Sequence, residues 1–261
     1  MLAKRFGNSS EPRGKSSFAA LTTGIAEIDA LSSGLPRSAI TEIIGVTSSG
    51  RTSVLLSVLA QATWSDEVCA LVDMGDRFDP ASAAYAGTAL DRLLWIRCAN
   101  NLERAFKATD LVLQSGGFGL VILDMADVAA QYARRIVSSW WYRFRRAIEH
   151  TPTALVVMSQ TSCVRSCASL SLDLKQKCLA WSYTTKAFET TSPLRINRLK
   201  RSNETALTLV SDLGQQPESF DSSLSHAFLL RGTGVQINQR KPISGEPRPK
   251  FTTRATFLER P

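Results

Sequence analysis

One short stretch of this chain limits the folds that the rest can adopt. The largely apolar residues 41–44 lead into an eight-residue loop, residues 45–52, and the run 53–60 leaves it. The first run is typical of a buried strand, and the last has the composition of a helix. A strand, a tight loop with two glycines and a helix, in this order, form the beginning of an α/β unit.

The residues that follow continue the alternation of short apolar runs with helical patterns. The first four candidate strands are largely apolar, which is typical of strands that are buried on both faces of a parallel sheet. We therefore predict an α/β fold with a mostly parallel central sheet flanked by helices. The candidate strands are 40–44, 68–74, 93–98, 119–124, 154–159, 194–199 and 206–211, and the candidate helices are 52–63, 80–86, 102–114 and 129–149.

The two ends of the chain are predicted to lie outside this core. We expect a flexible basic tail over residues 1–16, the core over 17–212, and a linker with a basic, proline-containing tail over 213–261. Residues 240–261 hold four prolines, and six lysines or arginines against two acids. This composition favours an extended tail that contacts nucleic acid or a partner protein, or one that binds nothing.

Charge and cysteine usage narrow the class of protein. The formal net charge is +8, which indicates polyanionic partners and nucleic acid first; solubility alone is the alternative. The five cysteines lack a second Cys/His pair that would complete a zinc site. Their odd number favours a reducing, cytoplasmic location. No run of eighteen apolar residues appears, so we expect no membrane span.

The loop itself has the spacing G-x-x-x-x-G-[K/R]-[S/T], which is typical of phosphate-binding loops. Its glycines let backbone N–H groups turn toward phosphate oxygens, and the N-terminus of the following helix adds positive potential. Thr52 can offer its hydroxyl to Mg²⁺. An ordinary Gly/Ser turn before a helix is the alternative. The candidate nucleotide-binding residues of the loop are Gly45, Val46, Thr47, Ser48, Ser49, Gly50, Arg51 and Thr52.

Four segments in sequence order resemble motifs of the RecA/recombinase core. They are the loop with its entry, residues 71–80 as the second core strand, 120–124 as a Walker B strand, and 154–160 as the strand whose final glutamine senses the γ-phosphate. The resemblance covers about residues 20–212 and implies a RecA-like P-loop core that binds ATP and Mg²⁺. It assigns Asp124 to the nucleotide and, with Thr52, to the metal. Alternatively, Asp124 caps a turn, and Gln160 is an ordinary exposed residue.

A later segment, residues 194–201, resembles the strand whose basic residues face a neighbouring protomer in that family. The resemblance implies that Lys200 and Arg201 are candidates for a protomer interface. It therefore also implies self-association of the chain.

Two departures from the family pattern concern the hydrolysis step. Arg51 stands where the family has a lysine, and arginine is a larger, planar cation rather than an equivalent point charge. Gly75 stands where the family has its catalytic glutamate, and the adjacent Asp76 is shorter and one residue out of register. Phosphoryl transfer depends on positioned charge and an oriented water. We therefore predict weak or absent ATP hydrolysis, with or without nucleotide binding, and only Asp76 and Gln160 as catalytic candidates.

The resemblance places DNA at two loops, which correspond here to residues 125–132 and 161–178. The first is very short, and the second carries Arg165, Lys175 and Lys177. A further basic cluster lies on the predicted helix 129–149, among aromatic residues that can stack bases. Its members are Arg134, Arg135, Arg143, Arg145 and Arg146.

The aromatic residues of the same helix have two interpretations. Ile136, Trp140 and Phe144 have helical spacing, which favours core packing. Trp141 and Tyr142 fall off that stripe, which leaves a partner surface as the alternative for them, since Arg, Trp and Tyr are enriched at interfaces.

A small RecA-like core with altered motifs is similar to the ImuA-type RecA homologues, which accompany an error-prone polymerase in damage-induced mutagenesis. The resemblance implies an accessory protein in DNA repair or SOS-type translesion synthesis. Its partners would be DNA, mainly single-stranded, and an error-prone polymerase or a RecA-type protein. The alternatives are an active DNA-dependent ATPase recombinase that uses Arg51 and Asp76, and a P-loop scaffold without DNA or ATP.

Overall fold

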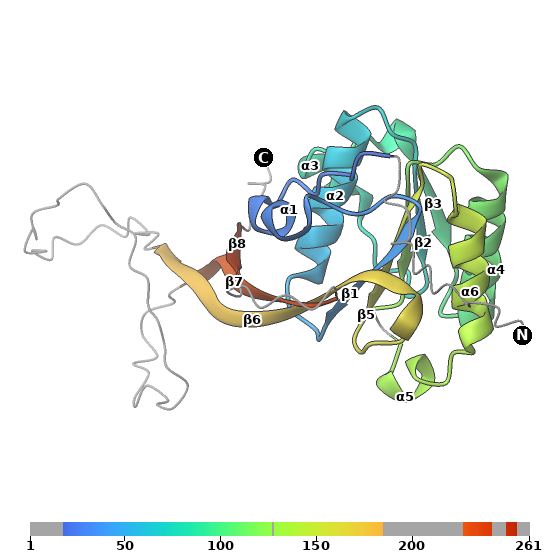
Figure 1. The fold of residues 1–261 in the computed structure, drawn as a ribbon. Coiled ribbons are helices and arrows are strands. Elements are labelled where there is room, and N and C mark those ends of the chain that lie inside the picture. The colour runs from blue at the N-terminus through green and yellow to red at the C-terminus, as the bar shows by residue number, and fades with distance from the viewer. Residues whose placement is uncertain (1–17, 127, 185–226, 242–248, 255–261) are drawn as a thin grey trace, which may run out of the picture.

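The computed structural model describes residues 18–126, 128–184, 227–241 and 249–254 (Figure 1). The helices are α1 (Ala26–Ser32), α2 (Arg51–Trp64), α3 (Pro80–Tyr85), α4 (Leu102–Ser115), α5 (Ala130–Ala133) and α6 (Ser138–Ile148). The strands are β1 (Ala39–Gly45), β2 (Cys69–Asp73), β3 (Leu93–Arg97), β4 (Leu120–Asp124), β5 (Ala154–Ser159), β6 (Ala168–Thr184), β7 (Ala227–Lys241) and β8 (Lys250–Arg254).

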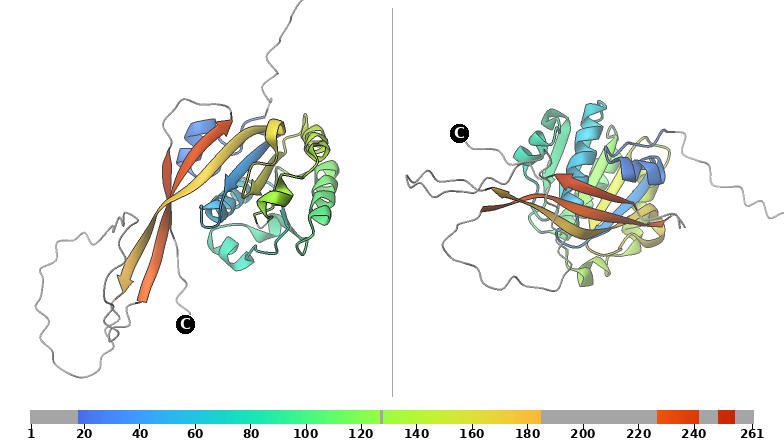
Figure 2. Two further views of the ribbon diagram at one scale, coloured as in Figure 1. Left: turned by 90° about the horizontal axis from the view of Figure 1, so that it is seen from below. Right: turned by 90° about the vertical axis from the view of Figure 1, so that its left-hand side faces the viewer.

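All eight strands form one sheet, in the order β3-β2-β4-β5-β1-β6-β7-β8. The first six in this order pair in parallel, and β6, β7 and β8 pair antiparallel. Figure 2 shows the long strands β6 and β7 running past the helical layers. The predicted α/β class with a mostly parallel sheet is therefore confirmed.

Helices cover both faces of the sheet and bury two apolar clusters. On one face, α2 contributes Leu55, Val58 and Leu59 to a cluster with the inward side chains of the strands. On the other face, α4 and α6 pack together through Phe106 and Phe144, whose rings stack with centroids 5.5 Å apart. A parallel sheet with this double cover needs strands that are largely apolar on both faces, and β1, β2 and β5 are mostly apolar and fully buried.

Side-chain caps begin the two helices that follow β2 and β3. Asp79 accepts hydrogen bonds from the backbone N–H groups of Ala81 and Ser82, and Pro80 fills the first position of α3. Asn101 accepts from the N–H of Arg104 at the start of α4. Such caps satisfy N–H groups that have no partner inside the helix.

The first five predicted strands and the first three predicted helices are present, with boundaries that shift by at most one residue. The single predicted helix 129–149 is wrong, because the chain forms α5 and α6 with an extended break at Val137. The β-branched pair Ile136-Val137 has low helix propensity and lies at this break. The predicted strands 194–199 and 206–211 and the tail 1–16 lie outside the described residues.

The predicted C-terminal tail is wrong for the residues that form β7 and β8. In β7, Val235 and Ile237 are buried, whereas Gln236 and Asn238, which alternate with them, are half-buried. This alternation with period two is typical of a strand. Phe251 of β8 is also buried. The prolines of the segment do not exclude it, since Pro249 precedes β8 and its carbonyl accepts a hydrogen bond from the N–H of Ile237.

The predicted loop 161–178 is also corrected, since β6 begins at Ala168. The side chains of Leu170, Leu172 and Leu174 are buried, but Ser171 and Asp173 are buried as well. Because these polar residues interrupt the apolar pattern, apolar runs alone do not predict this strand.

All five cysteines lie within the described residues and are free thiols. Four of the five free cysteines are buried, and Cys178 is exposed. No group of three or more His, Cys, Asp or Glu side chains that could hold a metal occurs within these ranges. None of the helices there is long and apolar enough to cross a membrane.

Candidate functional site

The phosphate loop, defined here as residues 45–52, lies where β1 ends and α2 begins. Ser48 and Gly50 both have left-handed backbone conformations, with φ of 63° and 94°. The N–H of Ser49 donates to the carbonyl of Val46 at 3.1 Å, which closes the turn. A side chain at Gly50 would place its Cβ 2.6 Å from Val235 Cγ2. Glycine is therefore required here both by backbone geometry and by the packing of β7.

A cavity of about 630 Å³ opens at the phosphate loop. Its walls are the loop, the first turns of α2, the segment 77–79 after β2, and Asp124 with Ala126 at the end of β4. The antiparallel strands complete it with Gln176, Thr233 and Thr253. A concave site of this size suits a small-molecule ligand.

Three functional candidates converge on the backbone of Ala126 at the side of this cavity. The carbonyl of Ala126 accepts a hydrogen bond from Gln160 Nε2 at 2.8 Å and from Arg51 Nη1 at 3.4 Å. Asp124 Oδ1 accepts from the N–H of Ala126 at 2.9 Å. The ends of β4 and β5 and the start of α2 are thus tied together beside the phosphate loop.

The residues present fit a phosphate group. Ser49 Oγ is buried and has no hydrogen-bond partner within the described residues. Buried hydroxyls normally have a partner, so this hydroxyl is a donor that a bound oxyanion can satisfy. Thr52 is exposed and lines the cavity together with Asp124, as a metal-bound nucleotide requires.

Asp76, the carboxylate adjacent to Gly75, is engaged by an arginine outside the cavity. Asp76 is not among the residues that line the cavity. Its two oxygens accept hydrogen bonds from Arg97 Nε and Nη2 at 2.5 and 2.6 Å, and these bonds hold the pKa of the Asp76 carboxyl below its ordinary value. Arg97 also lies 5.1 Å from the centre of the Trp95 ring. This arrangement disfavours Asp76 as a general base.

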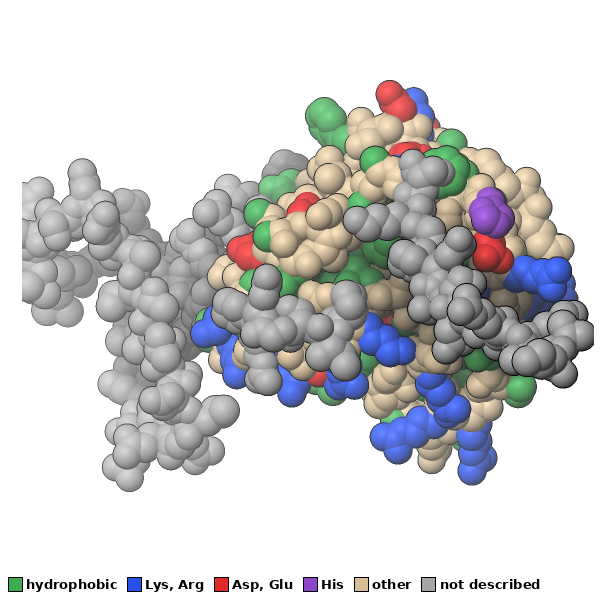
Figure 3. Space-filling view, in the orientation of Figure 1, with side chains coloured by type: hydrophobic (Ala, Val, Ile, Leu, Met, Phe, Trp, Pro, Cys, Tyr) green, Lys and Arg blue, Asp and Glu red, His purple; other side chains and the backbone are tan. Residues whose placement is uncertain are grey.

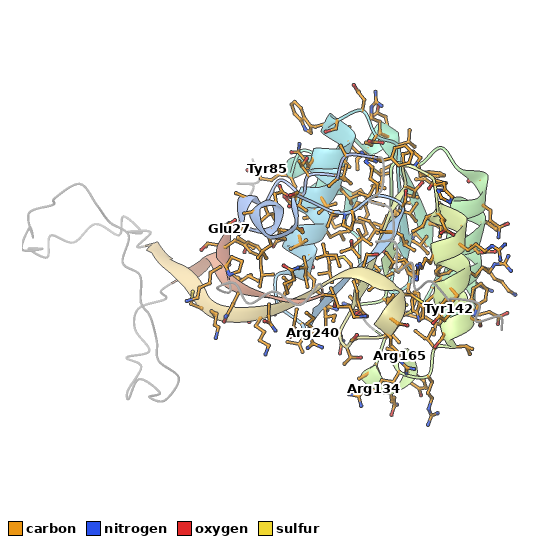
Figure 4. The ribbon with its side chains drawn as sticks, viewed as in Figure 1. Glu27, Tyr85, Arg134, Tyr142, Arg165 and Arg240 are labelled. Carbon is orange, nitrogen blue, oxygen red and sulfur yellow. The ribbon has the colours of Figure 1, made fainter. Side chains whose placement is uncertain are left out.

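Basic side chains from several elements gather around the segment between β5 and β6. Figure 3 shows Lys and Arg along the lower edge of the molecule, and Figure 4 labels Arg134, Arg165 and Arg240 there. Arg165 Nη2 donates to the carbonyl of Arg134 at 3.0 Å, and Lys241 Nζ donates to the carbonyl of Arg165. We call the exposed residues Arg134, Arg165, Lys175 and Arg240, with half-buried Lys241, the basic surface.

A cavity of about 670 Å³ lies within the basic surface. Arg134, Lys175 and Arg240 line it, as does Asp173, which forms an ion pair with Arg240 at 2.8 Å. Three cations against one carboxylate leave a positive potential. The sequence assigned Arg240 and Lys241 to a basic tail, so it did not predict their position near Arg134 and Arg165.

The remaining basic candidates are not all at this surface. Arg143 forms a two-bond ion pair with Asp110 on α4. Arg145 is half-buried, and Arg135, Arg146 and Lys177 are exposed. Lys200 and Arg201 lie outside the described residues.

The aromatic candidates of α6 separate into core and surface. Trp141 is 1% exposed and packs edge-on against Phe106, so the alternative of a partner surface does not hold for this residue. Tyr142 is 55% exposed. The core preference predicted for Phe144 is confirmed.

A phosphate loop at the carboxyl edge of a parallel sheet, with a strand-end carboxylate beside it, defines a P-loop protein of the α/β class. The RecA N-terminal domain model matches residues 2–138, just over half of the chain, and the chain belongs to this family. The match ends before Gln160 and the antiparallel strands.

Individual relatives match a shorter part of the chain. The Protein RecA of Haemophilus ducreyi is 38% identical over 107 residues, 40% of this chain and 28% of the relative. The Protein RecA of Methylococcus capsulatus is 41% identical over 91 residues, 35% of this chain and 26% of the relative. The chain thus matches only about a quarter of the length of these curated relatives.

Proposed function

We propose that this chain is a RecA-like accessory protein in DNA repair, of the kind that acts in SOS-type translesion synthesis. It binds single-stranded DNA and partner proteins, holds a nucleotide at the phosphate loop, and hydrolyses ATP slowly or not at all. The observation that carries the proposal is the combination of a well-formed phosphate loop with the loss of the residues that drive hydrolysis.

The nucleotide part rests on the residues around the cavity. Backbone N–H groups of the phosphate loop, the Ser49 hydroxyl and Arg51 would hold phosphate oxygens. Thr52 and Asp124 would hold Mg²⁺, which neutralises phosphate charge when it is bound. Gly75 has no side chain that can orient a water, and the Asp76 carboxylate is engaged by Arg97. Nucleotide binding without rapid turnover follows from this combination.

The nucleic-acid part rests on the basic surface. Its cations come from α5, the segment after β5, β6 and β7, so they converge on one area from distant parts of the sequence. Clustered Lys and Arg on one face suit a phosphate backbone. Single-stranded DNA fits best, because a flexible strand can follow an irregular row of cations.

The proposed binding of partner proteins rests on exposed residues near the basic surface. Tyr132, Val137 and Tyr142 are each more than half exposed on or beside α5 and α6. Exposed tyrosines beside arginines are typical of protein interfaces. An error-prone polymerase or a RecA-type protein is the partner that the ImuA-type resemblance implies, and self-association through Lys200 and Arg201 remains part of the proposal.

The test measures ATP binding and turnover with and without single-stranded DNA. We expect the wild-type chain to bind ATP with negligible turnover. The double variant Arg51→Lys/Gly75→Glu should hydrolyse ATP on the order of 10²-fold faster, since a positioned general base contributes about that much. Gly75 is not among the glycines with positive φ, so a glutamate can occupy this position without backbone strain.

Asp76→Asn is the matched control, because it removes a carboxylate but leaves the loop unchanged. We expect no change in the turnover of the wild-type chain. DNA-stimulated hydrolysis that disappears in Asp76→Asn would instead indicate an active recombinase. Binding of neither ATP nor DNA would leave only the scaffold interpretation.

A further inference from the structure

A buried carboxylate connects the strand of the phosphate loop to the segment that carries Arg165. Glu42 lies in the middle of β1 and is 1% exposed. Its Oε1 accepts hydrogen bonds from the backbone N–H groups of Cys163 and Val164, at 2.6 and 2.9 Å. Its Oε2 accepts from the hydroxyls of Ser162 and Ser171, at 2.9 and 3.3 Å.

This arrangement is unusual for a carboxylate in a core. Burial of a charge is costly unless the charge is paired or well hydrogen-bonded. None of the ion pairs in the described ranges includes Glu42. Four donors replace a cation here, and three of them belong to consecutive residues, Ser162, Cys163 and Val164. The carboxylate therefore fixes that short segment to β1.

The segment needs such support because of the residue that follows it. Arg165 has a φ of 56°, the left-handed region that is unfavourable for a side chain larger than glycine. Conformations of this kind persist only when their surroundings hold them. The two N–H groups that bind Glu42 come directly before Arg165, and contacts with Arg134 and Lys241 follow.

The same carboxylate lies between the two candidate sites along the chain. Glu42 is three residues before Gly45, the first residue of the phosphate loop. Ser162 is two residues after Gln160, which binds the carbonyl of Ala126 beside Arg51. The contacts of Glu42 thus join the base of the phosphate loop to the segment from Ser162 to Arg165.

We infer that Glu42 is a positioning residue that holds the segment 162–165 in place, so that Arg165 meets the phosphates of single-stranded DNA. The inference rests on the proposed DNA binding. Glu42 touches no ligand itself. Its loss lowers the fraction of molecules in which Arg165 is correctly placed, and the apparent affinity falls by that fraction.

Two serines that bind the same carboxylate oxygen offer a matched test. Ser162 belongs to the held segment, whereas Ser171 is the register partner of Glu42 in the β1–β6 ladder and stays in place without its hydroxyl. In the full-length chain, we expect Ser162→Ala to weaken binding of a fluorescent oligothymidine about fivefold, the effect of one hydrogen bond. Ser171→Ala should change it by less than about twofold on the same reasoning.

The salt dependence distinguishes positioning from contact. Ser162→Ala should leave the slope of log affinity against log salt unchanged, since the bound state keeps all its phosphate contacts. Glu42→Gln should retain affinity, because its amide oxygen can accept both N–H groups while its NH₂ donates to the two hydroxyls. Glu42→Leu should lose affinity if it folds. Equal effects of Ser162→Ala and Ser171→Ala would overturn the inference.

Amide hydrogen exchange separates this inference from the proposed function. We expect the N–H groups of Cys163 and Val164 to exchange about fivefold faster in Ser162→Ala, on the same hydrogen-bond estimate, and unchanged in Ser171→Ala. If the wild-type chain binds no DNA but this difference appears, the proposed function fails and the fixing of the segment by Glu42 stands. If DNA binds and the exchange rates do not differ, the role of Glu42 is overturned alone.

Discussion

The parallel and antiparallel parts of the sheet carry comparable cores but very different sequences. Every residue of β1, β2 and β5 is buried, and their sequences are mostly apolar. In β6 and β7, buried apolar residues alternate with polar ones, yet Val235 and Ile237 are as buried as the centre of β1. A polar sequence therefore does not mark the end of this domain. The antiparallel part also completes the cavity at the phosphate loop and supplies three of the five cations of the basic surface.

The largest expected effect tests whether the two parts form one core. Ile43 on β1 and Ile237 on β7 are 1% and 0% exposed, and both belong to the cluster beneath α2. We expect Ile43→Ala and Ile237→Ala each to lower the free energy of unfolding by about 2–5 kcal/mol, because each leaves a cavity. Urea denaturation followed by far-UV circular dichroism measures both changes.

Gln236→Ala, on the same strand but half-buried, is the control and should stay within about 0.5 kcal/mol of the wild type. If β7 were an appendage outside the core, Ile237→Ala would behave like this control. Two separate unfolding transitions would likewise show that the parallel and antiparallel parts of the sheet do not share one core.

The parallel part and the phosphate loop could be predicted because their signals are local. An apolar run, two glycines at fixed spacing and a helical run follow one another within twenty residues. The same kind of signal predicted the boundaries of β1 to β5 and α2 to α4 to within one residue. Parallel strands with helices on both faces are mostly apolar along their length, so their sequence is distinctive.

The features that were not predicted depend on contacts between residues that are distant in the sequence. The partners of Glu42 are 120 to 129 positions away along the chain, and no pattern near Glu42 indicates them. The sequence also does not predict the ion pair between Arg97 and Asp76, although this pair disfavours Asp76 as a general base. For Trp141 a signal did exist: Trp141, Phe144 and Ile148 have helical spacing and are all buried. The assumed longer helix obscured it.

A second prediction tests the contact between the two parts of the sheet at the phosphate loop. Gly50→Ala places a methyl group against Val235, whereas Gly117→Ala adds one at a similar positive φ, 83° against 94°, with nothing within 4 Å. We expect Gly117→Ala to cost about 1 kcal/mol for its backbone. Gly50→Ala should cost about 1–3 kcal/mol more, from overpacking. Thermal and urea unfolding of both variants measures the difference.

The double variant Gly50→Ala/Val235→Ala isolates that contact. We expect it to be less destabilised than the sum of the single variants by about 1 kcal/mol, since removal of the valine methyl groups relieves the crowding. If the two changes in unfolding free energy were strictly additive, the side chains at positions 50 and 235 would not be in steric contact.

The smallest expected effect concerns which arginines meet DNA. Arg165 belongs to the basic surface, whereas Arg143 is engaged by Asp110 on the outer side of α4 and α6. We expect Arg165→Ala to reduce the slope of log affinity against log salt by about one, because one phosphate contact is lost. Arg143→Ala should leave that slope unchanged. A titration of labelled single-stranded DNA at several salt concentrations measures both, and a change of slope in Arg143→Ala alone would move the binding surface from the β5–β6 segment to α6.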